Sequence, residues 1–340
     1  MFMEKMSVFF NQKQLEFAPK YEWALGNRIK HPESTKRAES IFKALSKDKS
    51  FNIIEPKKIP MSAIRDVHDF HLWTLYNAAE QLPDDQEFYP SVFLQRAGIE
   101  PNPANIKHAG YYCFDSGTPL NNKTLSAAGW SAACALEATK TVASGKARVA
   151  YALSRPPGHH ASFDTYGGYC YFNNAAIAAR ELKKKGRVAI LDIDFHHGNG
   201  SQEIFYEDPD VMVISIHGDP REYFPYLIGF PTETGKGKGA GFNLNVILPT
   251  GTKIKAYENA LKKQVFPIIK AYEPAHLIVS AGFDTYRLDP IGRFDIDTSE
   301  YERMGRLIND LGLPTVILQE GGYHTKDLGS NVRSFLQGFL

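Results

Sequence analysis

The chain has 340 residues, 43% of them hydrophobic, and its 39 Lys plus Arg nearly balance its 38 Asp plus Glu. This balance argues against the positive field of a nucleic-acid-binding or acidic-membrane-binding protein, and no apolar run approaches membrane-spanning length. We therefore expect no nucleic acid and no membrane among its partners. Because no Pro-, Gly- or Ser-rich linker divides it, we expect a single domain over 1–340.

The first residues and the cysteines indicate the compartment. Met1 to Lys5 lead into a polar, mixed segment and not into a signal peptide. The cysteines are odd in number and none forms a C-x-x-C pair: Cys113, Cys134 and Cys170. Reduced thiols in a cytoplasmic protein are therefore expected.

The predicted elements begin with an N-terminal extension of loops and helices, followed by a long insertion at about 75–110. Beyond it, short apolar runs predict strands at 148–153, 188–191, 211–216, 276–283 and 315–318. Helix-like stretches lie at 173–185, 254–272 and 299–311, the last with Thr298 or Ser299 as its N-cap. This alternation predicts an α/β fold with an open, mostly parallel, doubly wound sheet and helices on both faces.

Polar clusters follow these predicted strands at their carboxyl ends, where open α/β sheets bind ligands. Asp192, Asp194 and His196 alternate after the run at 188–191, so they would share one side of an extended chain. With Asp284, which follows the run at 276–283, Asp194 and His196 would make a three-ligand site with an open position, as in catalytic zinc centres. A satisfied polar ladder at 192–196 and a turn cap at Asp284 are the alternatives.

Two adjacent histidines, His159 and His160, follow a loop that contains two prolines. Histidine transfers protons near neutral pH, and each imidazole needs a partner on its second nitrogen. Asp192 and Asn199 are the candidate partners, and a carboxylate would make its histidine more basic than a carboxamide would. A metal-binding histidine pair, or histidines without a role, remain open.

Aromatic residues complete the predicted site. Tyr323 follows two glycines after the run at 315–318, where its hydroxyl could donate to a carbonyl oxygen that becomes negative. Tyr169 and Phe224 are candidate walls for a slender substrate. Plain packing is the alternative for all three.

The segments RPPGHH, GGYCYFNN, LDIDFHHGNGSQ, AGFD and EGGY together resemble the deacetylase branch of the arginase–deacetylase fold. The resemblance runs from about residue 20 to the C-terminus. It is strongest to the class II histone deacetylases and, more closely, to the bacterial acetylpolyamine amidohydrolases. Asn199 fits these groups, because class I deacetylases have an aspartate there.

The resemblance implies roles for individual residues. Asp194, His196 and Asp284 would bind one Zn²⁺, although Fe²⁺ and Co²⁺ suit the same ligands. His160 would be the principal base and then acid, with His159 beside it, Asp192 and Asn199 as their partners, and Tyr323 polarising the carbonyl. A structural K⁺ would be held by backbone carbonyls of Asp192, Asp194, His196, Ser215 and Ile216.

The resemblance also implies roles around the pocket. Arg37 would lie near an acetate channel, with a solvated surface arginine as the alternative. Asp115 would lie in a substrate-binding rim loop. Ile291 stands where the polyamine-selective animal deacetylase has a glutamate, and Ile106 and Gly117 stand where acidic residues can occur. The insertion at 75–110 would narrow the tunnel and build a homodimer.

The expected function is zinc-dependent removal of acetyl groups from small amines such as acetylputrescine or acetylcadaverine, giving acetate and the free amine. Acetyl-lysine proteins or peptides are the alternative substrates. An arginase-like dimanganese hydrolase would need further acidic ligands where Gly198 and Tyr286 stand. A non-catalytic binding protein is disfavoured, because none of the expected catalytic groups has been lost.

Overall fold

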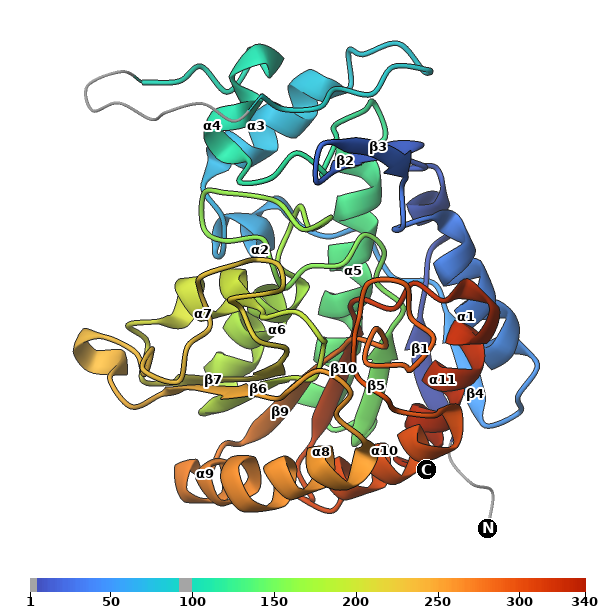
Figure 1. Ribbon diagram of the computed structural model, residues 1–340, viewed down its shortest axis with the longest axis vertical. Coiled ribbons are helices and arrows are strands. Elements are labelled where there is room, and N and C mark those ends of the chain that lie inside the picture. The colour runs from blue at the N-terminus through green and yellow to red at the C-terminus, as the bar shows by residue number, and fades with distance from the viewer. Residues whose placement is uncertain (1–4, 92–99) are drawn as a thin grey trace.

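The computed structural model describes residues 5–91 and 100–340 (Figure 1). An eight-stranded sheet forms its centre, in the order β4-β1-β5-β10-β9-β6-β7-β8, and every neighbouring pair is parallel. The strands are β1 (Met6–Phe9), β4 (Phe51–Ile54), β5 (Val149–Ala152), β6 (Val188–Asp192), β7 (Val211–His217), β8 (Asn243–Ile247), β9 (His276–Ala281) and β10 (Thr315–Gln319). The predicted fold class is confirmed.

The central strands are apolar along their length because both faces of the sheet are covered. Side chains of β6 alternate between two cores: Val188 and Ile190 belong to one, and Ala189 and Leu191 to the other. A continuous apolar run therefore marks a strand buried on both faces. This is why β5, β6, β7, β9 and β10 are visible in the sequence.

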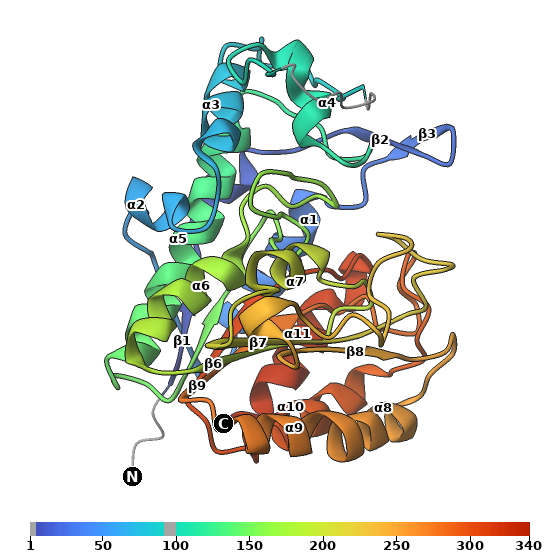
Figure 2. The ribbon, with the colours of Figure 1, turned by 90° about the vertical axis from the view of Figure 1, so that its left-hand side faces the viewer.

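Helices supply the two covering layers (Figure 2). The core on one face draws on α3 (Phe70–Ala79), α5 (Thr124–Ala143), α6 (Asn174–Leu182) and α7 (Asn199–Phe205). The core on the other face draws on α1 (Thr35–Ser46), α8 (Ile254–Ala260), α9 (Phe266–Tyr272), α10 (Tyr301–Asn309) and α11 (Thr325–Gln337). Two shorter helices are α2 (Met61–Arg65) and α4 (Ala109–Tyr112).

Several local predictions need correction. The strands β1, β4 and β8 were not expected: β4 and β8 are edge strands with polar residues among the apolar ones, and β1 lies in the N-terminal stretch that was expected to form loops and helices. The helical stretch at 254–272 contains a π-helical segment, Leu261–Val265. The prediction of Thr298 or Ser299 as an N-cap is wrong: Asp297 caps the turn and forms a capping box with Glu300.

A hairpin of β2 (Tyr21–Ala24) and β3 (Asn27–Lys30) lies at the same end of the molecule as α3 and α4 (Figures 1 and 2). The phenol of Tyr89, in the predicted insertion, donates to the carbonyl of Tyr21 at 2.5 Å. The insertion therefore contacts the hairpin. Part of it, residues 92–99, lies outside the described residues.

Two further findings concern the helices and the cysteines. No helix of the described chain is both long enough and apolar enough to cross a bilayer. Cys113, Cys134 and Cys170 are buried free thiols.

Candidate active site

The four adjacent strands β5, β10, β9 and β6 direct their carboxyl ends to one edge of the sheet. The metal-ligand candidates follow these strands in loops. Strand β6 ends at Asp192, so Asp194 and His196 lie beyond it, and β9 ends at Ala281, three residues before Asp284. Loops after neighbouring parallel strands meet above the sheet, which is how distant segments of the chain reach one site.

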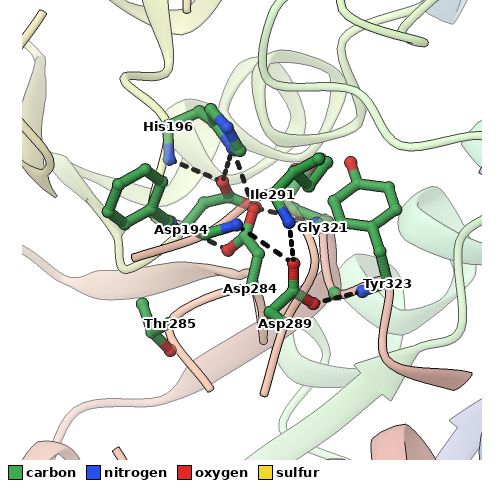
Figure 3. A network of polar contacts seen from close by, with 12 residues as sticks. Asp194, His196, Asp284, Thr285, Asp289, Ile291, Gly321 and Tyr323 are labelled. Carbon is green, nitrogen blue, oxygen red and sulfur yellow. Dashed lines mark hydrogen bonds and ion pairs between the residues drawn. The ribbon is translucent and has the colours of Figure 1, made fainter. Parts of the chain in front are cut away.

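Asp194, His196 and Asp284 present ligand atoms that lie within 4.8 Å of one another (Figure 3). Nδ1 of His196 is 2.9 Å from Oδ2 of Asp284 and 3.3 Å from Oδ1 of Asp194. Ligands at about 2.0–2.1 Å from a tetrahedral zinc ion are separated by about 3.3 Å, so these spacings suit one such ion.

Hydrogen bonds from the backbone hold the two carboxylates in place. Oδ1 of Asp284 accepts from the amide of Phe195 at 2.9 Å, and Oδ2 of Asp194 accepts from the amide of Gly321 at 2.8 Å. A Cβ at position 321 would lie 2.5 Å from Oδ2 of Asp284, so only glycine permits this approach. Backbone donors therefore fix the orientation of both carboxylates.

The electrostatics of this trio favour a cation. Burial, together with the negative charge of Asp194, raises the pKa of Asp284 to about 7. Burial alone would lower the pKa of His196, but hydrogen bonds to both aspartates outweigh it and raise that pKa to about 10. Two buried carboxylates this close repel each other, and a divalent ion offsets that repulsion. The donor types fit Zn²⁺, and Fe²⁺ or Co²⁺ as well.

The tandem histidines each have a different partner. Nδ1 of His159 donates to the carboxylate of Asp192 at 2.8 Å, and Nδ1 of His160 donates to the amide oxygen of Asn199 at 2.7 Å. All four residues are buried. Both Nδ1 atoms are therefore used by these partners, which disfavours the alternative of a metal-binding histidine pair.

The partners and the surroundings separate the two imidazoles in basicity. Burial opposes charge on His159, but the negative charge of Asp192 outweighs it and raises the pKa to about 10. Burial, followed by the positive charge of His159, holds the pKa of His160 well below 6.5. The pair thus combines a protonated imidazole with a neutral one whose Nε2 can accept a proton.

Glu320, which the sequence reasoning missed, supports the histidine loop from β10. Its Oε2 accepts from the amides of Gly158 at 2.7 Å and His159 at 3.2 Å. Burial raises the pKa of Glu320 to about 7. His159, Cys170 and Glu320 form a second group with metal-ligand atoms, but Nδ1 of His159 and this oxygen of Glu320 already make hydrogen bonds. One metal per chain fits the geometry better than two.

Tyr323 stands beside the metal group, and burial raises the pKa of its phenol well above 10. The hydroxyl therefore stays protonated and can donate. Its ring lies 4.7 Å from the guanidinium carbon of Arg37. Arg37 is 1% exposed, and its Nε donates to the carbonyl of Gly322 at 2.5 Å, so the alternative of a solvated surface arginine is wrong. Its role in acetate release stays a prediction.

A cavity of about 560 Å³ leads down to His160, His196 and Tyr323. The two predicted aromatic walls line it, and Phe114 stacks on Phe224 with ring centroids 5.8 Å apart. Ile291 and Asp115 line it as well. Oδ1 of Asp115 accepts from the amides of Gly117 and Thr118 at 2.9 Å each, so this carboxylate also organises the rim loop.

Glu22 is a second pocket carboxylate that the sequence reasoning missed. It lies on β2, is 6% exposed, and accepts a hydrogen bond from the hydroxyl of Tyr169 at 2.6 Å. Burial raises the pKa of Glu22. Its hairpin is short and largely exposed, so no periodic signal in the sequence points to this residue.

Comparison with known proteins gives the following relationships. Residues 31–339 match the histone deacetylase domain. An acetylpolyamine amidohydrolase of Burkholderia pseudomallei is 39% identical, with 98% of each chain covered, and acetylpolyamine amidohydrolase 2 of Pseudomonas aeruginosa is 46% identical over 74% of each. The crystal structure of the acetylpolyamine aminohydrolase from Burkholderia pseudomallei superimposes with a TM-score of 0.92, at 38% identity and 98% coverage of both chains.

Proposed function

The chain belongs to the histone deacetylase family, and from that membership we propose that it is a metal-dependent amidohydrolase that removes acetyl groups from small acetylated amines. Acetylputrescine and acetylcadaverine are the proposed substrates, and acetate and the free amine are the products. The observation that carries the proposal is the convergence of a three-ligand group, a neutral histidine and a protonated tyrosine on one pocket.

Asp194, His196 and Asp284 would hold the ion, and Zn²⁺ bound there would polarise the amide carbonyl and acidify a water molecule. His160 accepts a proton from the attacking water at its free Nε2, while Asn199 keeps Nδ1 protonated. The protonated histidine then delivers the proton to the leaving amine, which prevents expulsion of an amide anion. His159 stays cationic beside Asp192 and adds positive potential.

Tyr323 supplies the remaining stabilisation. Its hydroxyl donates a hydrogen bond to the carbonyl oxygen as that oxygen becomes negative. Because its pKa is raised, the phenol keeps its proton over the working pH range. The ring is held by the Arg37 guanidinium, so the donor is preorganised.

The pocket supports a small cationic substrate. Glu22 and Asp115 place two carboxylates in its lining, together with the aromatic pair of Phe114 and Phe224. A methylene chain suits the aromatic surface, and a distal ammonium group suits the carboxylates. The names of the full-length relatives, acetylpolyamine amidohydrolases, point to the same substrate class.

We also propose a homodimer. Three exposed apolar side chains line the pocket, Trp23 (47%), Leu25 (92%) and Tyr226 (49%), and the exposed Leu227 (76%) directly follows Tyr226 in the chain. A second copy that covers them would remove apolar surface from water and narrow access to the pocket. Leu25→Asp combined with Leu227→Asp should produce a monomer of reduced activity in sedimentation and kinetic assays; full activity in that monomer would contradict the proposal.

The structural K⁺ and a cytoplasmic location stay predictions. The backbone segments expected to hold K⁺ lie side by side, since Asp192 pairs with Ser215 in the sheet.

A substrate panel tests the proposed function. Zinc-loaded protein would be assayed with acetylputrescine, acetylcadaverine, the uncharged N-butylacetamide and an acetyl-lysine peptide. We expect the highest kcat/KM with the two acetyldiamines. A higher kcat/KM with the peptide would favour protein deacetylation instead.

A further inference from the structure

One carboxylate, Asp289, joins the loop after β9 to the loop after β10 (Figure 3). Its Oδ1 accepts from the amides of Ile291 at 3.0 Å and Gly292 at 3.1 Å. Its Oδ2 accepts from the amides of Tyr323 at 2.6 Å and His324 at 3.1 Å. Each oxygen thus serves a different loop, and the two loops are more than 30 residues apart in the sequence.

Backbone amides carry this interaction. Asp289 is 6% exposed, and within the described chain no lysine or arginine side chain pairs with it. Hydrogen bonds to an ionised acceptor are stronger than neutral ones. His324 is the N-cap of α11, so the positive end of that helix adds to the attraction.

The loop on the Oδ1 side reaches both the pocket wall and the metal group. Ile291 lines the pocket. Gly292 packs on the backbone of Asp284 so closely that a Cβ there would lie 1.6 Å from its carbonyl oxygen. This loop therefore has little freedom to move away from the site.

The loop on the Oδ2 side carries the tyrosine. The bond to Asp289 fixes the backbone nitrogen of Tyr323 itself, directly before the side chain that would donate to the substrate. Arg37 contacts the other end of the residue, at the ring. If the backbone at Ile291 moves, the Asp289 side chain moves with it and displaces the backbone of Tyr323, and with it the phenol.

We propose that Asp289 is a positioning residue that makes the Ile291 wall and the Tyr323 hydroxyl one rigid unit. The inference rests on the proposed function, and it adds a specificity mechanism. A substrate whose methylene chain packs against Ile291 also fixes Tyr323. The length of that methylene chain therefore affects kcat as well as KM. Shortened or branched chains that leave Ile291 uncovered lose turnover.

Asp289→Asn tests this, because the amide keeps the shape but turns one acceptor into an NH₂ group that faces two backbone donors. We expect kcat for acetylputrescine to fall about tenfold or more at unchanged zinc content, with KM within about threefold. In a Tyr323→Phe background the same substitution should lower kcat by less than about twofold. Equal factors in both backgrounds would overturn the proposal.

A matched control separates positioning from general destabilisation. Asp297→Ala removes a helix cap away from the pocket and should lower the melting temperature without changing the ratio of kcat values for acetylputrescine and acetylcadaverine. Asp289→Asn should change that ratio. An unchanged ratio would overturn the specificity part of the inference.

Amide hydrogen exchange on the unmodified protein tests the clamp without any activity assay or variant. The amides of Ile291 and Tyr323 should exchange with protection factors that agree within about threefold, because both are released when Asp289 moves. A difference of more than about tenfold would overturn the clamp. If the protein hydrolyses no acetylamine, the proposed function is wrong. The exchange measurement still tests the Asp289 clamp, because it does not depend on activity.

Discussion

Nδ1 of His160 lies 2.7 Å from the amide oxygen of Asn199, whereas Nδ1 of the neighbouring His159 lies 2.8 Å from the carboxylate of Asp192. The two imidazoles are adjacent in sequence, and their ring centroids are 4.0 Å apart. Burial and the nearby positive charge of His159 keep the pKa of His160 low, and Asn199 brings no negative charge to offset them, whereas the carboxylate of Asp192 keeps His159 protonated. The two imidazoles therefore differ in basicity because only His159 has a carboxylate partner to offset its burial.

Asn199→Asp should move the pH profile. A carboxylate beside His160 raises its pKa, because it stabilises the protonated imidazole. The base acts only when neutral, so activity rises with pH through that pKa, and a raised pKa shifts the acidic limb of kcat/KM to higher pH. The profile would be measured on acetylputrescine from pH 5 to 9. An unmoved acidic limb would contradict the role of His160 as base.

Tyr323→Phe should lower kcat by about 10²- to 10³-fold, the range found when one oxyanion donor is removed. KM and zinc content should stay within about threefold of the original protein, because the hydroxyl acts in the transition state. Single-turnover kinetics and metal analysis would measure both. A variant with kcat within threefold would remove the phenol from the mechanism.

Chelation of the metal should abolish activity, and Zn²⁺ or Co²⁺ should restore it. The ion also offsets repulsion between Asp194 and Asp284, so its removal should lower the melting temperature. Asp284→Asn should bind little metal and show little activity, as the chelated protein does. Asp297→Asn, which lies outside the site, is the control and should keep the metal.

Glu22→Gln should raise KM for acetylputrescine about tenfold, which corresponds to about 1.4 kcal/mol. KM for the uncharged N-butylacetamide should stay nearly constant, because only the cationic chain loses a charge partner. Glu16→Gln, outside the pocket, is the matched control. Equal effects on both substrates would exclude a charge contact at Glu22.

Stability should fall as pH drops below about 6.5, in part because of His68. Nε2 of this buried imidazole accepts from the amide of Asn173 at 2.8 Å, and Nδ1 donates to the carbonyl of Ser162 at 2.7 Å. Protonation of Nε2 would break the bond from Asn173, so the pair of bonds requires the neutral ring. Burial lowers its pKa to about 4. The unfolded chain takes up the proton first, so stability present above pH 6.5 is lost on acidification, at about 1.4 kcal/mol per pH unit.

His68→Gln keeps a donor and an acceptor but cannot be protonated. Urea unfolding at pH 7 and pH 5 should show that the variant loses about 2 kcal/mol less than the original protein over this interval. An identical loss in both proteins would show that His68 is not responsible.

The sequence reveals the centre of this fold better than its margins. Strands buried on both faces are continuous apolar runs, so β5, β6, β7, β9 and β10 could be located, together with the polar residues at their ends. Polar residues interrupt the other three strands, at Ser7 in β1, at Asn52 in β4 and at Asn243 and Asn245 in β8, so these strands give no such signal.

The supporting residues of the site were harder to find. Asp289 and Glu320 accept hydrogen bonds from backbone amides far away in the sequence, and such contacts depend on how the loops fold. Glu22 reaches the pocket from a short hairpin. The metal ligands and the tandem histidines come directly after predicted strands and could therefore be located. No local sequence pattern marks Asp289, Glu320 or Glu22.

The most direct test of the central claim is acetate release from acetylputrescine by the zinc-loaded protein, compared with its His160→Ala variant. We predict acetate and putrescine in equal amounts, with kcat/KM at least about tenfold above that for an acetyl-lysine peptide. The variant should be about 10²- to 10⁴-fold slower at unchanged zinc content. No acetate from the loaded protein, or full activity in the variant, would contradict the account.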